Sequence, residues 1–212
     1  AQFDAVAGDI GVDAAKTGMI ASRSIIRVVA AKIREYGIDQ LVVDPVMVAK
    51  GGASLMEESA RATLVKELIP LARVITPNIP EAEVLAGIRI RGKGDMKRAA
   101  EAIAALGARS VVLKGGHLEG DAEDLLFENG AFHFFHSPRL RTTDTHGTGC
   151  TFSAALAVGL AKGRSVEQAV AEAKRYVTAA IRHSLRLGGG HGPTNHLAPL
   201  LEERNRQEGE GS

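Results

Sequence analysis

The glycine-rich segment RTTDTHGTGCTFSAAL, residues 141–156, carries the only cysteine of the chain and runs into an apolar stretch. Such a stretch predicts a helix, whose first N–H groups have no partner within the helix and carry a partial positive charge. Glycines there let an anion approach closely. We therefore interpret residues 147–150 as a candidate site for a phosphoryl group. The alternative is that Thr145 or Thr148 only caps the helix.

Cys150 ends that turn, where a helix dipole favours negative charge, so its thiol could act as a base or a nucleophile. The alternative is a small buried core residue, a common environment for a lone cysteine. The turn does not end in the Lys-Ser/Thr pair of a P-loop, and it does not have the three-glycine spacing of a dinucleotide-binding fingerprint. The sequence thus disfavours both of these nucleotide-binding motifs.

Three other apolar runs end in polar residues. Asp44 follows LVV, Asn78 and Glu81 follow VIT, and Lys114 follows VVL. Asn78 and Glu81 could act through water on Mg²⁺, an ion that prefers oxygen ligands. Asp44 could be a carboxylate beside the metal or the phosphates, and Lys114 could contact a phosphate. The alternatives are a helix cap at Asn78 or Thr76, a turn-forming aspartate and a solvated lysine.

Alternating helical and strand patterns would position these side chains. Helical spacing covers residues 22–37, 56–69, 95–106, 147–163 and 165–185. Short apolar runs, typical of strands buried on both faces, cover residues 39–45, 72–76 and 109–116. Residues 124–137 alternate around Asn129-Gly130, the pair favoured in a two-residue hairpin turn. This order predicts an α/β fold with three layers: a mostly parallel central sheet with helices on both faces, plus a β-hairpin.

Ligands of such folds bind beyond the carboxyl ends of the strands. If the strands are parallel, the polar residues that follow them and the glycine turn should meet at one edge of the sheet. That convergence is what the candidate chemistry requires.

Composition limits the class of partner. The chain has 212 residues, of which 45% are hydrophobic, so one domain is expected. Lys and Arg number 26 against 25 Asp and Glu, and aromatic residues make up 4%, so we expect no nucleic-acid partner and no membrane partner. A single cysteine and no long apolar run favour a cytoplasmic location. The histidines do not have the spacing of a zinc site.

Five motifs, taken together, resemble one family. They are DPVM at 44–47, TPNIPEAE at 76–83, LKGGH at 113–117, DTHGTGCTFSAAL at 144–156 and GGGHGPTNH at 188–196. The chain resembles the hydroxymethylpyrimidine/phosphomethylpyrimidine kinases of thiamine biosynthesis, within the ribokinase-like superfamily. The match runs in order from about residue 1 to residue 197.

This resemblance implies ATP-dependent phosphorylation of hydroxymethylpyrimidine, a small aminopyrimidine alcohol, and then of its monophosphate, by a homodimer that uses Mg²⁺. It implies that Met19 and Val46 line the pyrimidine pocket. The resemblance gives catalytic roles to Gly147, Thr148, Gly149 and Cys150, and nucleotide-binding roles to Asn78, Glu81, Lys114 and Thr145. From the resemblance and the residue types together, we expect Asp44 and Glu81 to bind Mg²⁺ through water.

Two features depart from the wider superfamily or from the family. Most ribokinase-like relatives carry an aspartate where this chain has Cys150, and that aspartate deprotonates the acceptor hydroxyl. Because the second acceptor is an ionised phosphate, we expect Cys150 to assist only the first step. Relatives also carry roughly fifty more residues ahead of AQFDAV. We therefore expect residues 1–197 to be one kinase domain without its N-terminal strand–loop unit, followed by a charged tail at 198–212.

Three rival readings stay open. A pyridoxal kinase-like enzyme would share the fold and the chemistry but take a different ring. A fragment that binds nucleotide without turnover would fit the early start of the sequence. A hydrolase with Cys150 as nucleophile would need an orienting histidine, and only His146 is near in sequence, which leaves Lys114 unexplained.

Overall fold

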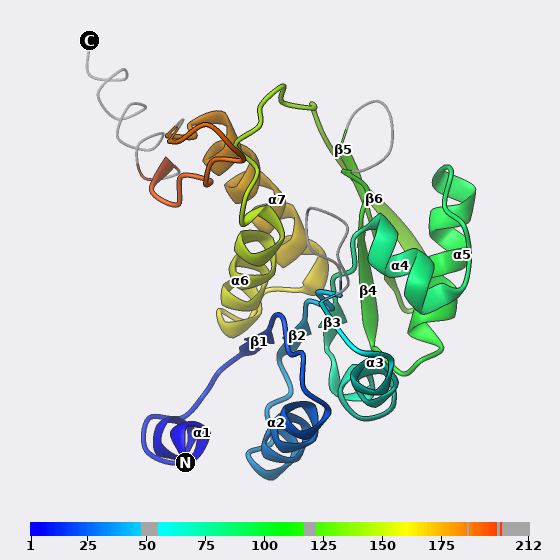
Figure 1. Cartoon of the computed structure of the whole chain (residues 1–212), viewed down its shortest axis with the longest axis vertical. Helices are drawn as coiled ribbons and strands as arrows, with labels where there is room; N and C mark the ends of the chain where they lie inside the picture. Colours follow the sequence, from blue (N-terminus) through cyan, green and yellow to red (C-terminus); the bar gives the residue numbers. More distant parts are fainter. Residues whose placement is uncertain (48–54, 117–121, 186, 199, 201–212) are drawn as a thin grey trace.

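The computed structural model describes residues 1–47, 55–116, 122–185, 187–198 and 200. Its strands form one six-stranded sheet in the order β1-β2-β3-β4-β5-β6 (Figure 1). The strands are β1 (Ala15–Thr17), β2 (Leu41–Val43), β3 (Val74–Ile75), β4 (Ser110–Lys114), β5 (Ala122–Glu128) and β6 (Ala131–Ser137). The strands from β1 to β4 are parallel, whereas β5 and β6 run antiparallel to their neighbours. His117 and residues 199 and 201–212 of the predicted tail lie outside the described residues.

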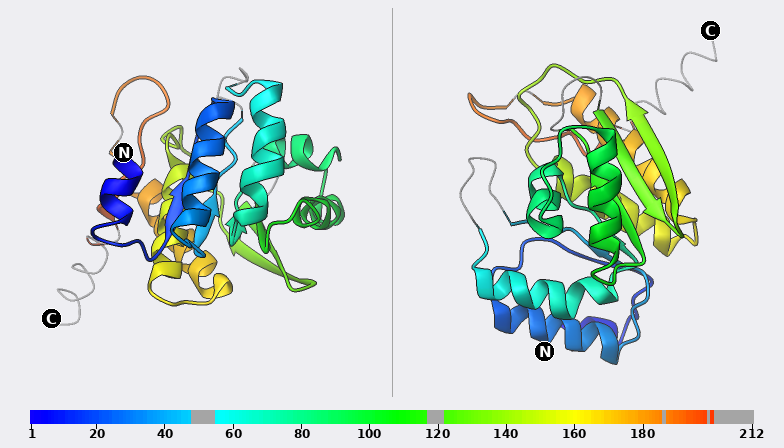
Figure 2. Two further views of the ribbon diagram at one scale, coloured as in Figure 1. Left: turned by 90° about the horizontal axis from the view of Figure 1, so that it is seen from below. Right: turned by 90° about the vertical axis from the view of Figure 1, so that its right-hand side faces the viewer.

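Helices cover both faces of the sheet (Figures 1 and 2). The helices are α1 (Gln2–Ala7), α2 (Arg23–Glu35), α3 (Glu58–Thr63), α4 (Ile79–Ala86), α5 (Lys93–Ala104), α6 (Thr148–Ala161) and α7 (Val166–Arg182). Alternate residues of a strand point to opposite faces. Accordingly, Val42 packs with α6 and α7, while Leu41 and Val43 join the cluster that contains residues of α2, α3 and α5. The predicted three-layer α/β fold with a mostly parallel sheet is confirmed.

The hairpin between β5 and β6 follows the sequence prediction closely. Asn129 and Gly130 have φ of 50° and 77°, the positive values that a type I′ turn requires at both central residues. The turn sets the register Glu128↔Ala131, and the pairing continues to Ala122↔Ser137. Local turn chemistry therefore determines which residues of the two strands face each other.

The helix expected over residues 56–69 is less regular than predicted. It begins with α3, continues as a π-helix over Leu64–Leu68 and ends in a 3₁₀ turn over Ile69–Leu71. Pro70 stands inside that last turn and has no N–H group to donate to an α-helical ladder. The π-helical turn thus precedes the proline, and the 3₁₀ turn that contains the proline ends the helix.

Helices α6 and α7 pack closely at Gly159. A Cβ atom added there would lie 2.7 Å from Cβ of Ala169 and 3.1 Å from its Cα.

The helices in the described part of the chain lack the length and the apolar composition that spanning a bilayer requires.

The Gly159→Ala substitution should lower the free energy of unfolding by about 1–3 kcal/mol, because the added methyl group overpacks the contact with α7. The same substitution at Gly94 of α5 is the matched control, since no described atom lies within 4 Å of the Cβ that it adds. There we expect no loss and a gain of up to about 1 kcal/mol from helix propensity. Urea unfolding of both variants measures the difference, and equal effects would contradict the packing argument.

Candidate active site

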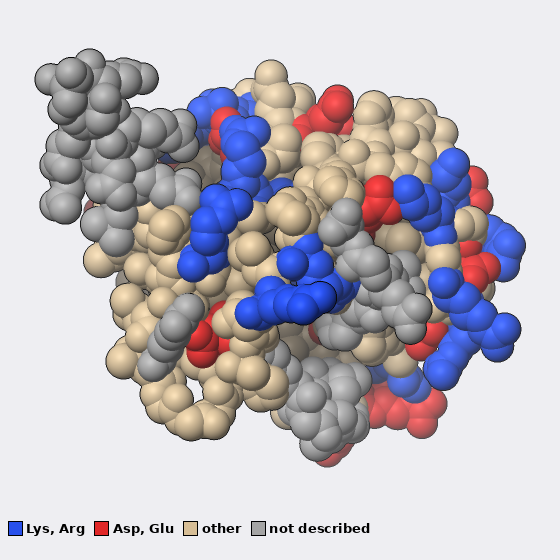
Figure 3. All heavy atoms as spheres, turned by 90° about the horizontal axis from the view of Figure 1, so that it is seen from above, with Lys and Arg blue, Asp and Glu red and all other residues tan. Residues whose placement is uncertain are grey.

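The carboxyl ends of three adjacent parallel strands meet at one edge of the sheet. Asp44 directly follows β2, Asn78 lies beyond β3, and Lys114 is the last residue of β4. The backbone N–H of Lys114 donates to the carbonyl oxygen of Pro77 at 2.8 Å, and Asn78 forms an isolated parallel bridge with Lys114. Figure 3 looks at the molecule from above Figure 1, and Lys and Arg side chains gather near the middle of that face.

A buried carboxylate joins these strands to α6. Asp44 is 2% exposed, and its Oδ1 accepts hydrogen bonds from Nζ of Lys114 at 2.9 Å and from Oγ1 of Thr76 at 3.1 Å. Its Oδ2 accepts a hydrogen bond from Oγ of Ser153 in α6 at 3.3 Å. A buried ion pair is tolerated when further hydrogen bonds satisfy the charges. Asp44 therefore holds Lys114 and α6 in fixed positions.

The ammonium group of Lys114 lies beside the start of α6. A Cβ atom added to Gly149 would lie 3.2 Å from Nζ of Lys114 and 3.8 Å from Oδ2 of Asp44. A larger residue at this position would push the lysine ammonium away from the start of the helix. Two sources of positive potential, the lysine and the first N–H groups of the helix, thus lie together.

The N-cap of α6 is Gly147, not Thr145 or Thr148. Gly147 has φ of 83°, in the left-handed region that favours glycine, and as a glycine it offers no capping side chain. The hydroxyl of Thr148 instead donates to the carbonyl oxygen of Thr145 at 2.8 Å. The alternative of a threonine N-cap is therefore wrong, and the N-cap residue supplies no side-chain acceptor to the helix N-terminus.

Asn78 and Glu81 form a capping box at the start of α4. The N–H of Glu81 donates to Oδ1 of Asn78 at 2.9 Å, and the N–H of Asn78 donates to Oε2 of Glu81 at 2.8 Å. The alternative that Asn78 caps the helix is thus confirmed, and the same capping box fixes the Glu81 carboxylate.

Within the described residues, no group of three or more His, Cys, Asp and Glu side chains is arranged to hold a metal. Asp44 and Glu81 could supply only part of a Mg²⁺ shell, an ion that normally keeps several waters.

Burial raises the pKa of Glu81 to about 7. The positive charge of Lys114 and hydrogen bonds from the backbone at Asn78 and Met47 lower this pKa, and the negative charge of Asp44 raises it. Burial outweighs the opposing effects because Glu81 is only 3% exposed. The carboxyl group therefore gains or loses its proton near neutral pH.

Three more predicted site residues lie at this end of the molecule. Met19 follows β1 and is 56% exposed, and half-buried Val46 follows β2. Because Thr17 pairs with Val43, both residues leave the same edge of the sheet. Cys150 is exposed at the start of α6, so its alternative as a buried core residue is wrong.

Sequence reasoning missed how the C-terminal segment supports the glycine turn. The N–H of His146 donates to the carbonyl oxygen of Gly192 at 3.0 Å, and the N–H of Thr194 donates back to His146 at 3.3 Å. In α6, Oγ1 of Thr151 lies 3.0 Å from Nε2 of His196. The motif GGGHGPTNH was the available signal, but nothing in it reveals a contact made across some 45 residues of chain.

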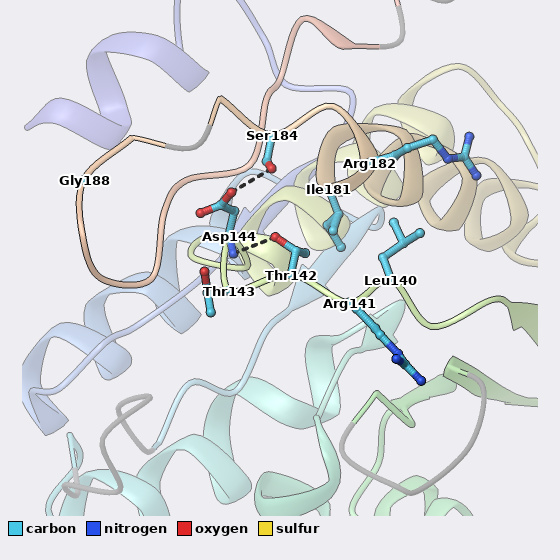
Figure 4. Close-up of a pocket in the computed structure, with 9 residues that line it drawn as sticks. All are labelled: Leu140, Arg141, Thr142, Thr143, Asp144, Ile181, Arg182, Ser184 and Gly188. Carbon is cyan, nitrogen blue, oxygen red and sulfur yellow. Dashed lines mark hydrogen bonds between the residues drawn. The ribbon is translucent and has the colours of Figure 1, made fainter.

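A cavity of about 730 Å³ lies next to the glycine turn (Figure 4). Nine residues line it: Leu140, Arg141, Thr142, Thr143, Asp144, Ile181, Arg182, Ser184 and Gly188. The hydroxyl of Ser184 donates to Oδ2 of buried Asp144 at 2.8 Å. The cavity is widely open to solvent and adjoins the candidate anion site, since Asp144 directly precedes Thr145.

Comparison with known proteins identifies the family. A family model described as phosphomethylpyrimidine kinase matches residues 1–195. The chain belongs to the phosphomethylpyrimidine kinase family. The relatives of this kinase include a hydroxymethylpyrimidine/phosphomethylpyrimidine kinase of Bacillus subtilis, 50% identical over 199 residues, which are 93% of this chain and 73% of that protein. The resemblance drawn from the motifs is confirmed.

Two further similarities extend the comparison. A thiamine biosynthesis bifunctional protein of Geobacter sulfurreducens is 53% identical over 206 residues; the match takes in 97% of this chain but only 42% of that protein. Among solved structures, the ADP complex of a Bacillus subtilis pyridoxal kinase has a TM-score of 0.87 at 41% identity, over 94% of this chain and 75% of that one. This member of the phosphomethylpyrimidine kinase family therefore shares its fold with a pyridoxal kinase.

The raised pKa of Glu81 predicts a pH-dependent stability. Between its usual value of 4.5 and about 7, the folded chain holds a proton that the unfolded chain has lost, so stability should fall as the pH rises through this window. The full loss is on the order of 3 kcal/mol. Glu81→Gln should remove this loss and become more stable relative to the parent from pH 5 to pH 8, as measured by urea unfolding in metal-free buffer. Glu58→Gln, at an exposed site in α3, is the control, and a Glu81→Gln difference that stays constant with pH would contradict the assignment.

Proposed function

We propose that this chain uses ATP to phosphorylate hydroxymethylpyrimidine and then the resulting monophosphate. The observation that carries the proposal is the ammonium group of Lys114 beside Gly149, at a helix N-terminus whose N-cap is a glycine. Phosphoryl transfer passes through a loose transition state, so catalysis depends mainly on positioning and on neutralising charge. Membership of a kinase family and the names of the relatives support the same reaction.

Each site residue has a proposed part in this reaction. The N–H groups of Gly147, Thr148, Gly149 and Cys150 stabilise the transferring phosphoryl group. Lys114 neutralises the phosphates of ATP, and Thr145 contacts the nucleotide beside it.

We assign Asn78, Glu81 and Asp44 to Mg²⁺, chiefly through water. Mg²⁺, when bound, neutralises charge on the phosphates. The chain's own contribution is the capping box, which aims the Glu81 carboxylate, and the pairing of Asp44 with Lys114. Oxygen donors of this kind suit the ion.

The cavity beside the glycine turn is the proposed site for the adenosine part of ATP. Its walls from Leu140 and Ile181 are apolar, while Thr142, Thr143 and Ser184 offer hydroxyl groups. Arg141, Asp144 and Arg182 add charged groups to the lining, so the apolar residues could contact a flat ring while the polar ones orient it. The pyrimidine is assigned to the other side of the turn, near Met19 and Val46.

Pyridoxal is the second candidate substrate. The similarity to a pyridoxal kinase, with a TM-score of 0.87, favours it as an alternative within the same chemistry. The proposal also includes a homodimer, the commonest closed assembly of identical chains, and a cytoplasmic location, which the single cysteine supports.

A direct competition of acceptors tests the function. With ATP and Mg²⁺, we expect the chain to form ADP with hydroxymethylpyrimidine at a kcat/KM at least about tenfold above that with pyridoxal, the low end of what pocket contacts provide. A preference for pyridoxal would establish the alternative. Binding of ATP in calorimetry without turnover of either acceptor would contradict the proposed activity.

Cys150→Ala tests the proposed base. We expect the first phosphorylation to slow roughly 10- to 100-fold, because a general base no longer takes the hydroxyl proton. The second phosphorylation should stay within about twofold, since an ionised phosphate needs no base. The second reaction is thus the internal control, and ATP affinity should not change. Loss of both reactions at unchanged ATP affinity would overturn this role for the thiol.

A further inference from the structure

A second buried ion pair lies behind the site, between β5 and α7. Nζ of Lys174 donates to Oδ2 of Asp124 at 2.7 Å, and the two side chains are only 9% and 10% exposed. Burying two charges is costly unless both are fully paired. The pair has no part in the proposed chemistry, so its place in the molecule needs a separate explanation.

Asp124 also fixes the backbone next to Lys114. Its Oδ1 accepts a buried hydrogen bond from the N–H of Gly115 at 2.9 Å. Gly115 is pressed so closely against β5 that an added Cβ atom would collide with the carbonyl oxygen of Glu123. The residue that follows the site lysine is therefore held from two directions.

Asp124 and Lys114 stand directly opposite each other in the β4–β5 ladder. Side chains that face each other across an antiparallel pair lie on the same side of the sheet, with Cβ atoms about 4.5–5.5 Å apart. A lysine with a carboxylate so near would normally pair with it. Here the ammonium of Lys114 pairs with Asp44 instead, and Lys174 pairs with Asp124.

We propose that Lys174 and Asp124 are positioning residues for Lys114. Asp124 anchors the Gly115 backbone, and Lys174 occupies the carboxylate that would otherwise draw the Lys114 ammonium away from Asp44 and Gly149. Without Lys174, Asp124 keeps an unpaired buried charge, and Lys114 stands directly opposite it in the ladder. The anion site then loses its lysine although every residue of the site is still present.

The inference rests on the proposed function in one respect, that Lys114 contacts the phosphates of ATP. Calorimetry with ATP and Mg²⁺, and separately with adenosine, measures that contact. Lys174→Met should weaken ATP binding about 10- to 100-fold, the size of a lost charge-assisted hydrogen bond. Adenosine binding should stay within about twofold, because adenosine has no phosphate for Lys114 to contact.

A double variant distinguishes positioning from general stability. In Lys174→Met with Asp124→Asn, the asparagine Oδ1 can still accept from Gly115, and no charge remains to attract Lys114. This double variant should bind ATP within about threefold of the parent, as coupled residues are not additive. The matched control is Arg73→Met, which breaks the pair between Arg73 and Glu128 at the other end of β5. It should lower stability and leave the ratio of ATP to adenosine affinity unchanged.

A measurement without ligand separates this inference from the proposed function. Hydrogen exchange of the Gly115 amide should accelerate at least about tenfold in Lys174→Met, in excess of any global change, because an Asp124 carboxylate that turns to pair with Lys114 no longer accepts from Gly115. The exchange rate should recover in the double variant, which has no such charge. If the parent chain does not bind ATP, the proposed function fails, and the exchange result still decides the positioning role. Unchanged exchange at Gly115 together with an unchanged ATP-to-adenosine ratio would overturn the inference.

Discussion

The buried contact between Asp44 and Lys114 is the interaction on which the site depends. A carboxylate that is 2% exposed must be paired, and its partners are Thr76, which directly follows β3, Lys114 in β4 and Ser153 in α6. Parallel strands make this possible because they deliver their carboxyl ends to one edge. The same contact that satisfies a buried charge therefore aligns three strands and brings the glycine turn of α6 onto the lysine.

That arrangement leaves the partial positive charge of the helix N-terminus at the turn. The N-cap of α6 has no side chain, and Lys114 lies next to the first N–H groups, while Asp44 is buried behind them. Because Asp44 already pairs with Lys114, the positive potential that remains at the turn comes from the first N–H groups of the helix. The C-terminal segment, which hydrogen-bonds to His146 and Thr151, keeps the turn from relaxing away from this state. A turn of this kind suits an anion, and a phosphoryl group is the one proposed for it.

Local pattern was enough to predict most of the fold but only part of the site. The periodicity of the long helices and the Asn129-Gly130 turn are properties of short segments. The polar residues that follow the predicted parallel strands could also be expected to meet at one edge of the sheet. Asp124 and Lys174 were missed because each looks ordinary where it stands, one in an alternating strand and one in a charged helix. Their burial depends on α7 covering β5, and a contact 50 residues apart in sequence leaves no local signal. The three-residue strand β1 was too short to show a period.

Two carboxylates of this site are held in different ways, and the difference has a chemical consequence. Asp44 has a lysine, a threonine and a serine as donors, whereas Glu81 has backbone N–H groups and little solvent. With a pKa of about 7, Glu81 holds a proton in a large share of molecules at neutral pH. If Glu81 serves Mg²⁺ as proposed, the cation must displace that proton in order to use the carboxylate, so cation binding would release a proton. Under the proposed function, burial would thus make the Glu81 carboxylate fully available only when a cation replaces its proton.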